Sequence, residues 1–110
     1  MYYRKYGNKK VLINGIWFES KKEGKRYSEL LLLERVGKIS DIKLQPRFLL
    51  QESFKKNGKT YRKIEYVADF QYMENGKMIV EDTKGFKTEV FKLKHKLFEY
   101  KYPDLELKLL

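Results

Sequence analysis

Short apolar runs on either side of an Asn-Gly pair are the clearest pattern in the chain. Two-residue Asn-Gly loops favour tight β-hairpins, because the type I′ turn needs positive φ angles at both central positions and these residue types tolerate them. The pair occurs at residues 14–15, 57–58 and 75–76. The pattern therefore predicts three hairpins, the first over residues 11–18 and the third over residues 66–84.

Two longer segments have apolar residues at helical spacing, and each begins with a capping residue. Ser20 with Glu23 three positions later matches a capping box, and Gly37 suits the position just after the helix ends. Glu23 falls at the edge of the apolar face of this first helix. Thr88 is the predicted cap of a second helix, which ends before Pro103.

The remaining segments complete an α/β fold of the α+β type. Residues 39–44 and 48–51 are predicted strands on either side of Gln45-Pro46, and alternating leucines over 105–109 predict a closing strand. The expected core is therefore a helix, three strands in a meander, a helix and a last strand, behind an N-terminal hairpin. A helix before the last strand permits a parallel crossover, so we expect a mixed central sheet flanked by helices. No linker or repeat divides residues 1–110, which predicts a single domain.

The third hairpin places two acidic residues opposite each other. Counting outward from Asn75-Gly76, a two-residue loop pairs Asp69 with Asp82. Like charges at directly opposite positions are destabilising. Lys84 lies two residues beyond Asp82, so the strand period of 2 puts it on the same face. Two carboxylates and an ammonium group gathered in this way favour a bound cation; the alternative is that the two aspartates are exposed and paired to Lys84.

This arrangement resembles the PD-(D/E)XK nuclease superfamily, in which an Asp is followed one hairpin later by Asp or Glu, any residue and then Lys. Asp69 is on the second core strand, Asp82-Thr83-Lys84 is on the third, and Glu23 is on the preceding helix. The chain is also similar to a small phage and prophage family assigned to that superfamily, in four runs: residues 20–23, 44–46, 66–70 and 80–85. The resemblance covers nearly the whole chain. It implies a restriction-endonuclease-like αβββαβ core and hydrolysis of DNA phosphodiester bonds.

Two neighbouring positions test the match. Ala68 stands where the superfamily has a Pro before the first Asp, a position that varies widely in such enzymes. Glu81 adjoins Asp82 and is a rival for the second carboxylate. Pleating decides against Glu81, because it points to the opposite face from Asp69.

The residue types limit the metal that such a site would hold. The chain has no cysteine and one histidine, so oxygen ligands dominate, which favours Mg²⁺ or Mn²⁺ over Zn²⁺. Asp69 and Asp82 are the expected ligands. Glu23, directly or through water, and the carbonyl of Thr83 would add to them. Lys84 would position or deprotonate the attacking water, or stabilise the pentacovalent phosphate.

Two candidate residues also suit a role that involves no ligand. Glu23 occupies the position where a capping box favours Glu for the sake of the helix alone. Gln45, before Pro46, would orient the site or contact DNA, but a turn residue at the entry to a strand is an equal alternative.

The chain carries a large excess of positive charge. Lys and Arg total 25 against 15 Asp and Glu, which gives a formal net charge of +10 at pH 7. Such an excess favours a polyanionic partner, and nucleic acid is the usual one. Arg4 and Lys5, in a basic segment over residues 1–9 that we expect to be flexible, are candidates for DNA contact, as are Lys92 and Lys96 on the second helix. A solvated surface is the alternative for these residues.

The sequence gives no sign of membrane insertion or secretion. No apolar run approaches the roughly 20 residues of a membrane span. The first six residues contain no apolar stretch resembling a signal peptide. The absence of cysteine is compatible with a reducing compartment, so we expect a cytoplasmic protein with no membrane partner.

Together, these features favour a Mg²⁺-dependent DNA endonuclease. The family resemblance implies phage recombination or replication in the bacterial host, with branched DNA such as a Holliday junction as the preferred substrate. Cleavage of both strands would suit a homodimer with two sites. Two other functions stay open: a catalytically inactive nucleic-acid-binding module and a basic phage protein-interaction domain.

Overall fold

A four-stranded mixed sheet lies at the centre of the computed structural model, which describes residues 9–83 and 88–110. The strand order is β10 (Glu106–Leu109), β9 (Lys77–Asp82), β8 (Phe70–Glu74) and β3 (Ser40–Leu44). Strands β3, β8 and β9 are antiparallel, whereas β10 is parallel to β9. The core order α1-β3-β8-β9-α2-β10 and the mixed sheet confirm the predicted α+β fold.

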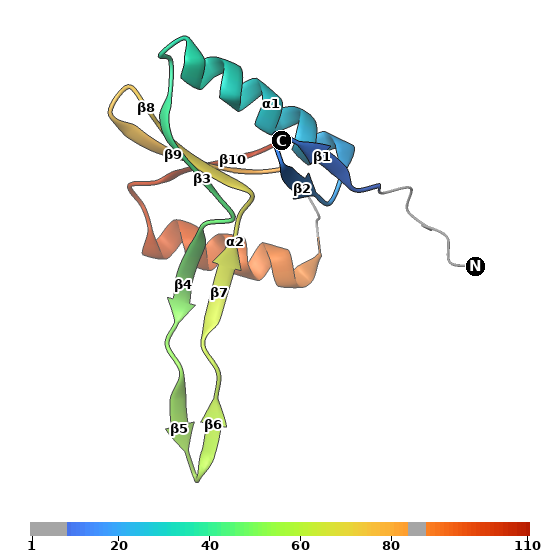
Figure 1. Cartoon of the computed structure of the whole chain (residues 1–110). Helices are drawn as coiled ribbons and strands as arrows, with labels where there is room; N and C mark the ends of the chain where they lie inside the picture. The colour runs from blue at the N-terminus through green and yellow to red at the C-terminus, as the bar shows by residue number, and fades with distance from the viewer. Residues whose placement is uncertain (1–8, 84–87) are drawn as a thin grey trace, which may run out of the picture.

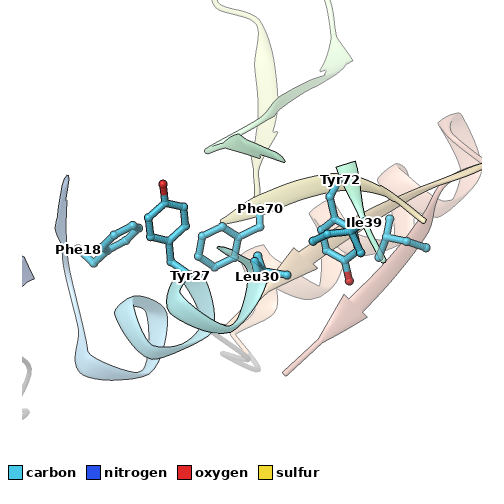
Figure 2. Packing of buried hydrophobic residues seen from close by; sticks show 7 residues of the cluster. Phe18, Tyr27, Leu30, Ile39, Phe70 and Tyr72 are labelled. Atoms are coloured by element: carbon cyan, nitrogen blue, oxygen red, sulfur yellow. The ribbon is translucent and has the colours of Figure 1, made fainter. Parts of the chain in front are cut away.

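The two helices pack against opposite faces of this sheet (Figure 1). Helix α1 (Lys21–Arg35) contributes Tyr27 and Leu30 to one apolar cluster, together with Phe70 (Figure 2). Ile79 belongs to the same cluster. Helix α2 (Glu89–Lys101) contributes Phe98 to a second cluster that includes Val80. Because Ile79 and Val80 are consecutive on β9, their side chains point to opposite faces, which gives each helix a core of its own. Neither helix in the described part of the chain is long and apolar enough to cross a membrane.

The ends of α1 follow the predicted capping chemistry. The backbone N–H of Glu23 donates to Oγ of Ser20 at 3.2 Å. At the other end Gly37 has φ +80°, and the N–H of Lys38 donates to the carbonyl of Leu33, as in a Schellman motif. Helix α2 begins in the same way at Thr88.

The N-terminal hairpin is docked on α1. Its strands, β1 (Val11–Ile13) and β2 (Ile16–Phe18), pair as the Asn-Gly turn predicts. A Cβ atom added at Gly24 of α1 would lie 2.4 Å from Cγ2 of Val11. The absence of a side chain at residue 24 therefore allows the hairpin to approach the helix closely.

The predicted meander is correct in strand order but is interrupted by a long excursion between β3 and β8. The chain continues through β4 (Arg47–Gln51) and β5 (Phe54–Lys56), turns, and returns through β6 (Lys59–Tyr61) and β7 (Ile64–Val67). Strand β4 pairs with β7 and β5 with β6, so the whole excursion is an antiparallel ribbon (Figure 1). The base of the ribbon is covered by α2, since Phe48, Leu50 and Tyr66 are buried with Phe98. Every residue from 51 to 64, here called the arm, is exposed.

The register of β8 and β9 agrees with the prediction until its last pair. Glu74 faces Lys77, and the ladder runs outward to Phe70 opposite Glu81. The prediction that Asp69 would pair with Asp82 is wrong: Asp69 lies in a bend before β8, and its N–H donates to the carbonyl of Glu81 at 3.0 Å. Asp69 and Phe70 thus share one partner residue, as in a β-bulge. The bend arises because the chain passes here from its pairing with β4 to its pairing with β3 and β9.

Candidate functional site

Two buried carboxylates lie at neighbouring strand ends. Asp69 precedes β8, and Asp82 is the last residue of β9; their residues are 3% and 5% exposed. Burying a carboxylate is costly unless hydrogen bonds or opposite charge compensate it. The surroundings of the pair therefore decide what it can do.

Neighbouring donors fix the orientation of both carboxylates. Thr83 donates twice to Oδ2 of Asp69, from its backbone N–H and from Oγ1, each at 2.7 Å. The hydroxyl of Tyr66 donates to Oδ2 of Asp82 at 2.6 Å. One oxygen of each carboxylate is thereby held by donors from a neighbouring segment.

Tyr66 connects the two acids electrostatically. Burial raises the pKa of its hydroxyl far above the usual value, the hydrogen bond to Asp82 raises it further, and the charges of Asp82 and Asp69 act in the same direction. The phenol therefore stays protonated and remains a donor. The charge of Asp69 thus contributes to the raised pKa of the hydroxyl that donates to Asp82.

A cavity of about 230 Å³ adjoins Asp69. Glu23, on the first turn of α1, and Gln45, at the end of β3, line it together with Asp69. Gln45 has φ +48°, an uncommon value for a residue other than glycine, and its N–H donates to the carbonyl of Asp69 at 2.9 Å. The other lining residues are Ile16, Trp17, Phe18, Glu19 and Leu44. The structure thus brings Glu23, Gln45 and Asp69 to one cavity.

The donor set suits a hard divalent cation. Within residues 9–83 and 88–110, no group of three or more Asp, Glu, His or Cys side chains has an arrangement that could hold one ion. Mg²⁺ is usually held by one or two carboxylates, with water and substrate phosphate oxygens filling the remaining positions. Asp69 and Asp82 fit that pattern. Glu23 fits a contact through water better than a direct one.

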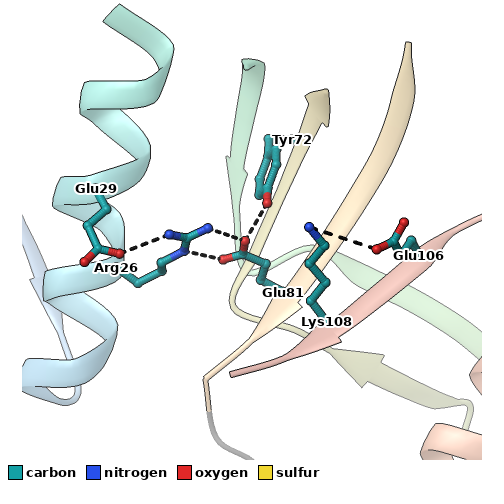
Figure 3. A network of polar contacts seen from close by, with 6 residues as sticks. All are labelled: Arg26, Glu29, Tyr72, Glu81, Glu106 and Lys108. Carbon is teal, nitrogen blue, oxygen red and sulfur yellow. Dashed lines mark hydrogen bonds and ion pairs between the residues drawn. The ribbon is translucent and has the colours of Figure 1, made fainter. Parts of the chain in front are cut away.

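Glu81 points away from this pair, to the α1 side of the sheet (Figure 3). Nε and Nη2 of Arg26 donate to its two carboxylate oxygens at 2.8 and 2.7 Å, and the hydroxyl of Tyr72 donates to Oε2. Hydrogen bonding to Glu81 raises the pKa of Arg26 further above its usual value. Glu81 is therefore the fully buried partner of a guanidinium, in agreement with its predicted orientation.

The residues predicted to contact nucleic acid are not gathered at the cavity. Lys92 and Lys96 are exposed on α2, and Lys92 lies 3.4 Å from Glu89. Neither lysine lines the cavity. Arg4, Lys5 and the predicted catalytic Lys84 lie outside the described residues.

Sequence reasoning missed two residues around the site and gave a third, Thr83, a different contact. The predicted contribution of Thr83 was its carbonyl, whereas its N–H and hydroxyl hold Asp69. Tyr66 is the partner of Asp82, and Trp17, 65% exposed, lines the cavity beside Glu23. The hydroxyl of Thr83, directly after a candidate ligand, was the one readable signal. Tyr66 and Trp17 reach the site only through tertiary packing.

Comparisons with known proteins give a family but no activity. A model of the family described as "Protein of unknown function (DUF1064)" matches residues 3–110. No curated protein matches the chain, and no solved structure does.

Proposed function

The chain belongs to the DUF1064 family, whose description leaves the activity open, and we propose that it is a divalent-metal-dependent DNA endonuclease of PD-(D/E)XK type. The single observation behind the proposal is the pair of buried carboxylates, Asp69 and Asp82, held at adjacent strand ends in a chain of net charge +10. A positive chain attracts a polyanion. A pair of buried acids at close quarters favours a cation between protein and phosphate.

The proposed roles follow from the contacts of each residue. Asp69 and Asp82 bind the metal, while Thr83 and Tyr66 hold the two carboxylates in the binding orientation. A bound Mg²⁺ or Mn²⁺ would lower the pKa of a coordinated water and offset the negative charge of the phosphate. Because the hydroxyl of Tyr66 keeps its proton, it donates to Asp82 throughout the working pH range.

Residues across the cavity would act on the substrate side. Glu23 orients a water molecule, and Gln45 offers an amide to the nucleic acid near the entry to β4. Lys84, outside the described residues, keeps the role that the resemblance implies: positioning or deprotonating the attacking water, or stabilising the pentacovalent phosphate. Lys92, Lys96, Arg4 and Lys5 would contact backbone phosphates.

The biological setting is also part of the proposal. The similarity to a phage and prophage family supports a role in phage recombination or replication in the host cytoplasm. Branched DNA, such as a Holliday junction, is the favoured substrate. A homodimer would place two sites on the two strands.

Cleavage assays test this proposal directly. Plasmid, branched and single-stranded DNA are incubated with the protein in Mg²⁺, Mn²⁺ or EDTA. We expect metal-dependent nicking that Asp82→Asn abolishes while DNA binding survives. Asp104→Asn, which removes an exposed carboxylate in the turn before β10, is the matched control and should cleave normally.

Thermal melting gives a second readout that needs no turnover. A metal that binds only the native state raises the melting temperature by mass action. Mg²⁺ should therefore stabilise the native chain and Asp104→Asn but not Asp82→Asn. Equal melting temperatures with and without metal in the native chain, together with intact DNA in every metal, would exclude the nuclease.

A catalytically silent DNA-binding module is the second candidate. The observation in its favour is that the described residues hold no three-membered cluster of metal-ligating side chains. It predicts DNA binding that is indifferent to EDTA and to Asp82→Asn, with no cleavage of any substrate.

A further inference from the structure

The arm has an unusual concentration of one charge. Residues 54–63 contain five basic and no acidic residues: Lys55, Lys56, Lys59, Arg62 and Lys63. These ten residues supply +5 of the net +10 of the chain. Half of the excess positive charge is therefore on a ribbon that lies outside the sheet (Figure 1).

Few contacts hold this ribbon. Strands β5 and β6 pair with each other, and no other described helix or strand packs on them. The rings of Phe54 and Tyr61 stack at 4.8 Å between centroids and 9° between planes, and Asn57-Gly58 closes the turn. An isolated two-stranded hairpin is marginally stable in water. A segment that extends so far without a core is expected to gain stability from a partner.

The pairing across the arm brings two like charges together. Lys56 and Lys59 are directly opposite each other, which is destabilising for like charges. They share a face with the Phe54–Tyr61 pair, because each lysine lies two residues from one of the rings. Nζ of Lys59 is 5.1 Å from the ring centroid of Tyr61. One face of the arm thus presents two ammonium groups beside two aromatic rings, a combination that suits nucleic acid.

The ribbon that carries the arm starts beside the candidate site. The ribbon bends where the N–H of Gln45 meets the carbonyl of Asp69 and the N–H of Ala68 meets the carbonyl of Pro46. From there β4 and β7 lead outward to the arm. DNA with a phosphate at Asp69 and Asp82 would therefore have the arm alongside a neighbouring stretch of the same molecule.

We propose that the arm binds duplex DNA as a two-stranded ribbon lying in the major groove, with its lysines on the flanking phosphates. The major groove is about 12 Å wide and admits a ribbon of this kind. This inference deepens the proposed nuclease by assigning affinity to the arm and chemistry to the acidic pair. The position of the arm contact relative to the cleaved bond rests on the proposed function, whereas DNA binding by the arm needs no catalysis.

A charge-neutralising pair of substitutions tests the contact. Lys56→Gln/Lys59→Gln is compared with Lys38→Gln/Lys101→Gln, which removes the same charge from exposed positions outside the arm. Binding to duplex DNA is measured in EDTA at several salt concentrations. Loss of two phosphate contacts should reduce the slope of log K against log salt by about 1.8. The same relation predicts affinity roughly 10- to 100-fold weaker at 0.1 M salt for the arm variant.

Footprinting locates the groove. Guanine N7 lies in the major groove, so the native protein should protect it from methylation and Lys56→Gln/Lys59→Gln should not. Protection confined to adenine N3 in the minor groove would overturn the major-groove assignment. Equal salt slopes for the arm and control variants would overturn the DNA contact as a whole.

Three further outcomes distinguish the DNA contact from self-association and from the nuclease. If the arm variant changes the sedimentation behaviour of the free protein while duplex binding is unaltered, the arm contacts a second copy of the chain and the inference is wrong. If the arm variant shows the reduced salt slope but the native protein cleaves no DNA in any metal, the nuclease fails and the arm contact stands. If cleavage is normal and the salt slope of the arm variant is unchanged, the nuclease stands and the arm contact fails.

Discussion

The arm and the rest of the described chain, here called the body, differ in the sign and the burial of their charged side chains. In the body four carboxylates are buried: Glu23, Asp69, Glu81 and Asp82. In the arm the charged side chains over residues 54–63 are all basic and all exposed. The excess of positive charge is therefore displaced outward from an acidic interior.

The difference shows what a buried charge and an exposed charge each contribute. A buried charge is expensive, and it persists only with specific donors such as Arg26 for Glu81 or Tyr66 for Asp82. Its position is fixed, which suits chemistry at a defined atom. An exposed charge costs little and acts over a Debye length of about 10 Å in ordinary salt, which suits attraction of a polyanion. Under the proposed function, the body would carry out the reaction and the arm would supply affinity for DNA.

Removal of one partner from the buried ion pair should have the largest effect on stability. Arg26→Met leaves the carboxylate of Glu81 buried without its guanidinium, which costs about 3–5 kcal/mol. Urea unfolding measures this loss. Lys56→Gln, which removes one positive charge from the arm, should change the free energy of unfolding by less than about 0.5 kcal/mol.

A compensated variant separates charge burial from packing. Arg26→Met/Glu81→Leu/Tyr72→Phe replaces the network by apolar groups and should recover most of the lost stability, because the desolvated charge is gone. If the triple variant is as unstable as Arg26→Met alone, the network is needed for its shape and the contrast with the arm loses its electrostatic basis.

The alkaline limb of the stability curve should report the buried tyrosines of the body. Burial and hydrogen bonding raise the pKa of Tyr66 and of Tyr72 above the ordinary value of 10.0. Above pH 10 the unfolded chain therefore loses two protons that the folded chain keeps. The contribution of these two tyrosines to stability is constant below that pH and falls above it by about 1.4 kcal/mol per pH unit for each tyrosine.

Single substitutions show how much each tyrosine contributes to the slope of unfolding free energy against pH. In urea titrations at several alkaline pH values, Tyr66→Phe and Tyr72→Phe should each reduce that slope by the equivalent of one proton. Tyr100→Phe, which alters a tyrosine that is 86% exposed, is the control. A slope that stays at two protons in Tyr66→Phe would show that the hydroxyl near Asp82 is not the group that titrates.

Matched turn glycines should show how far the arm is uncoupled from the body. Gly76 and Gly58 have φ angles of +77° and +75° in equivalent Asn-Gly turns. Alanine at either position costs about 1–2 kcal/mol locally, because the left-handed conformation strains a Cβ atom. Gly76→Ala should lower the global stability by that amount, whereas Gly58→Ala should only fray the arm. The same loss for both would mean that the arm and the body unfold together.

Local sequence signals predicted those parts of the fold that depend on neighbouring residues. The turns at Asn-Gly set the register of β8 and β9, and Ser20 and Thr88 set the starts of the helices. The opposite orientations of Glu81 and Asp82, which are consecutive on β9, follow from the strand period alone. These features need no knowledge of what packs above the strand.

The features that were missed depend on tertiary packing. The bend at Asp69 arises because its strand changes partners, which the local pattern does not record. The hydroxyl of Tyr66, on β7, contacts Asp82, at the end of β9, because tertiary packing brings these two strands together. The β-propensity of residues 54–61 is the same for a docked hairpin and a projecting one, so the sequence predicted the strands but not their exposure.

The exposed hairpin tip between Lys56 and Lys59 is also a point at which proteolysis would divide the chain into two fragments. Trypsin has several target bonds there, and exposed hairpin tips are preferred points of nicking. A cut would separate a fragment with Glu23 and Gln45 from one with Asp69 and Asp82. The two peptides would still be joined by the ladders of β3 with β8 and β4 with β7. The fold thus suits fragment complementation: each half carries only part of the cavity lining, and mixing the halves would reassemble the cavity.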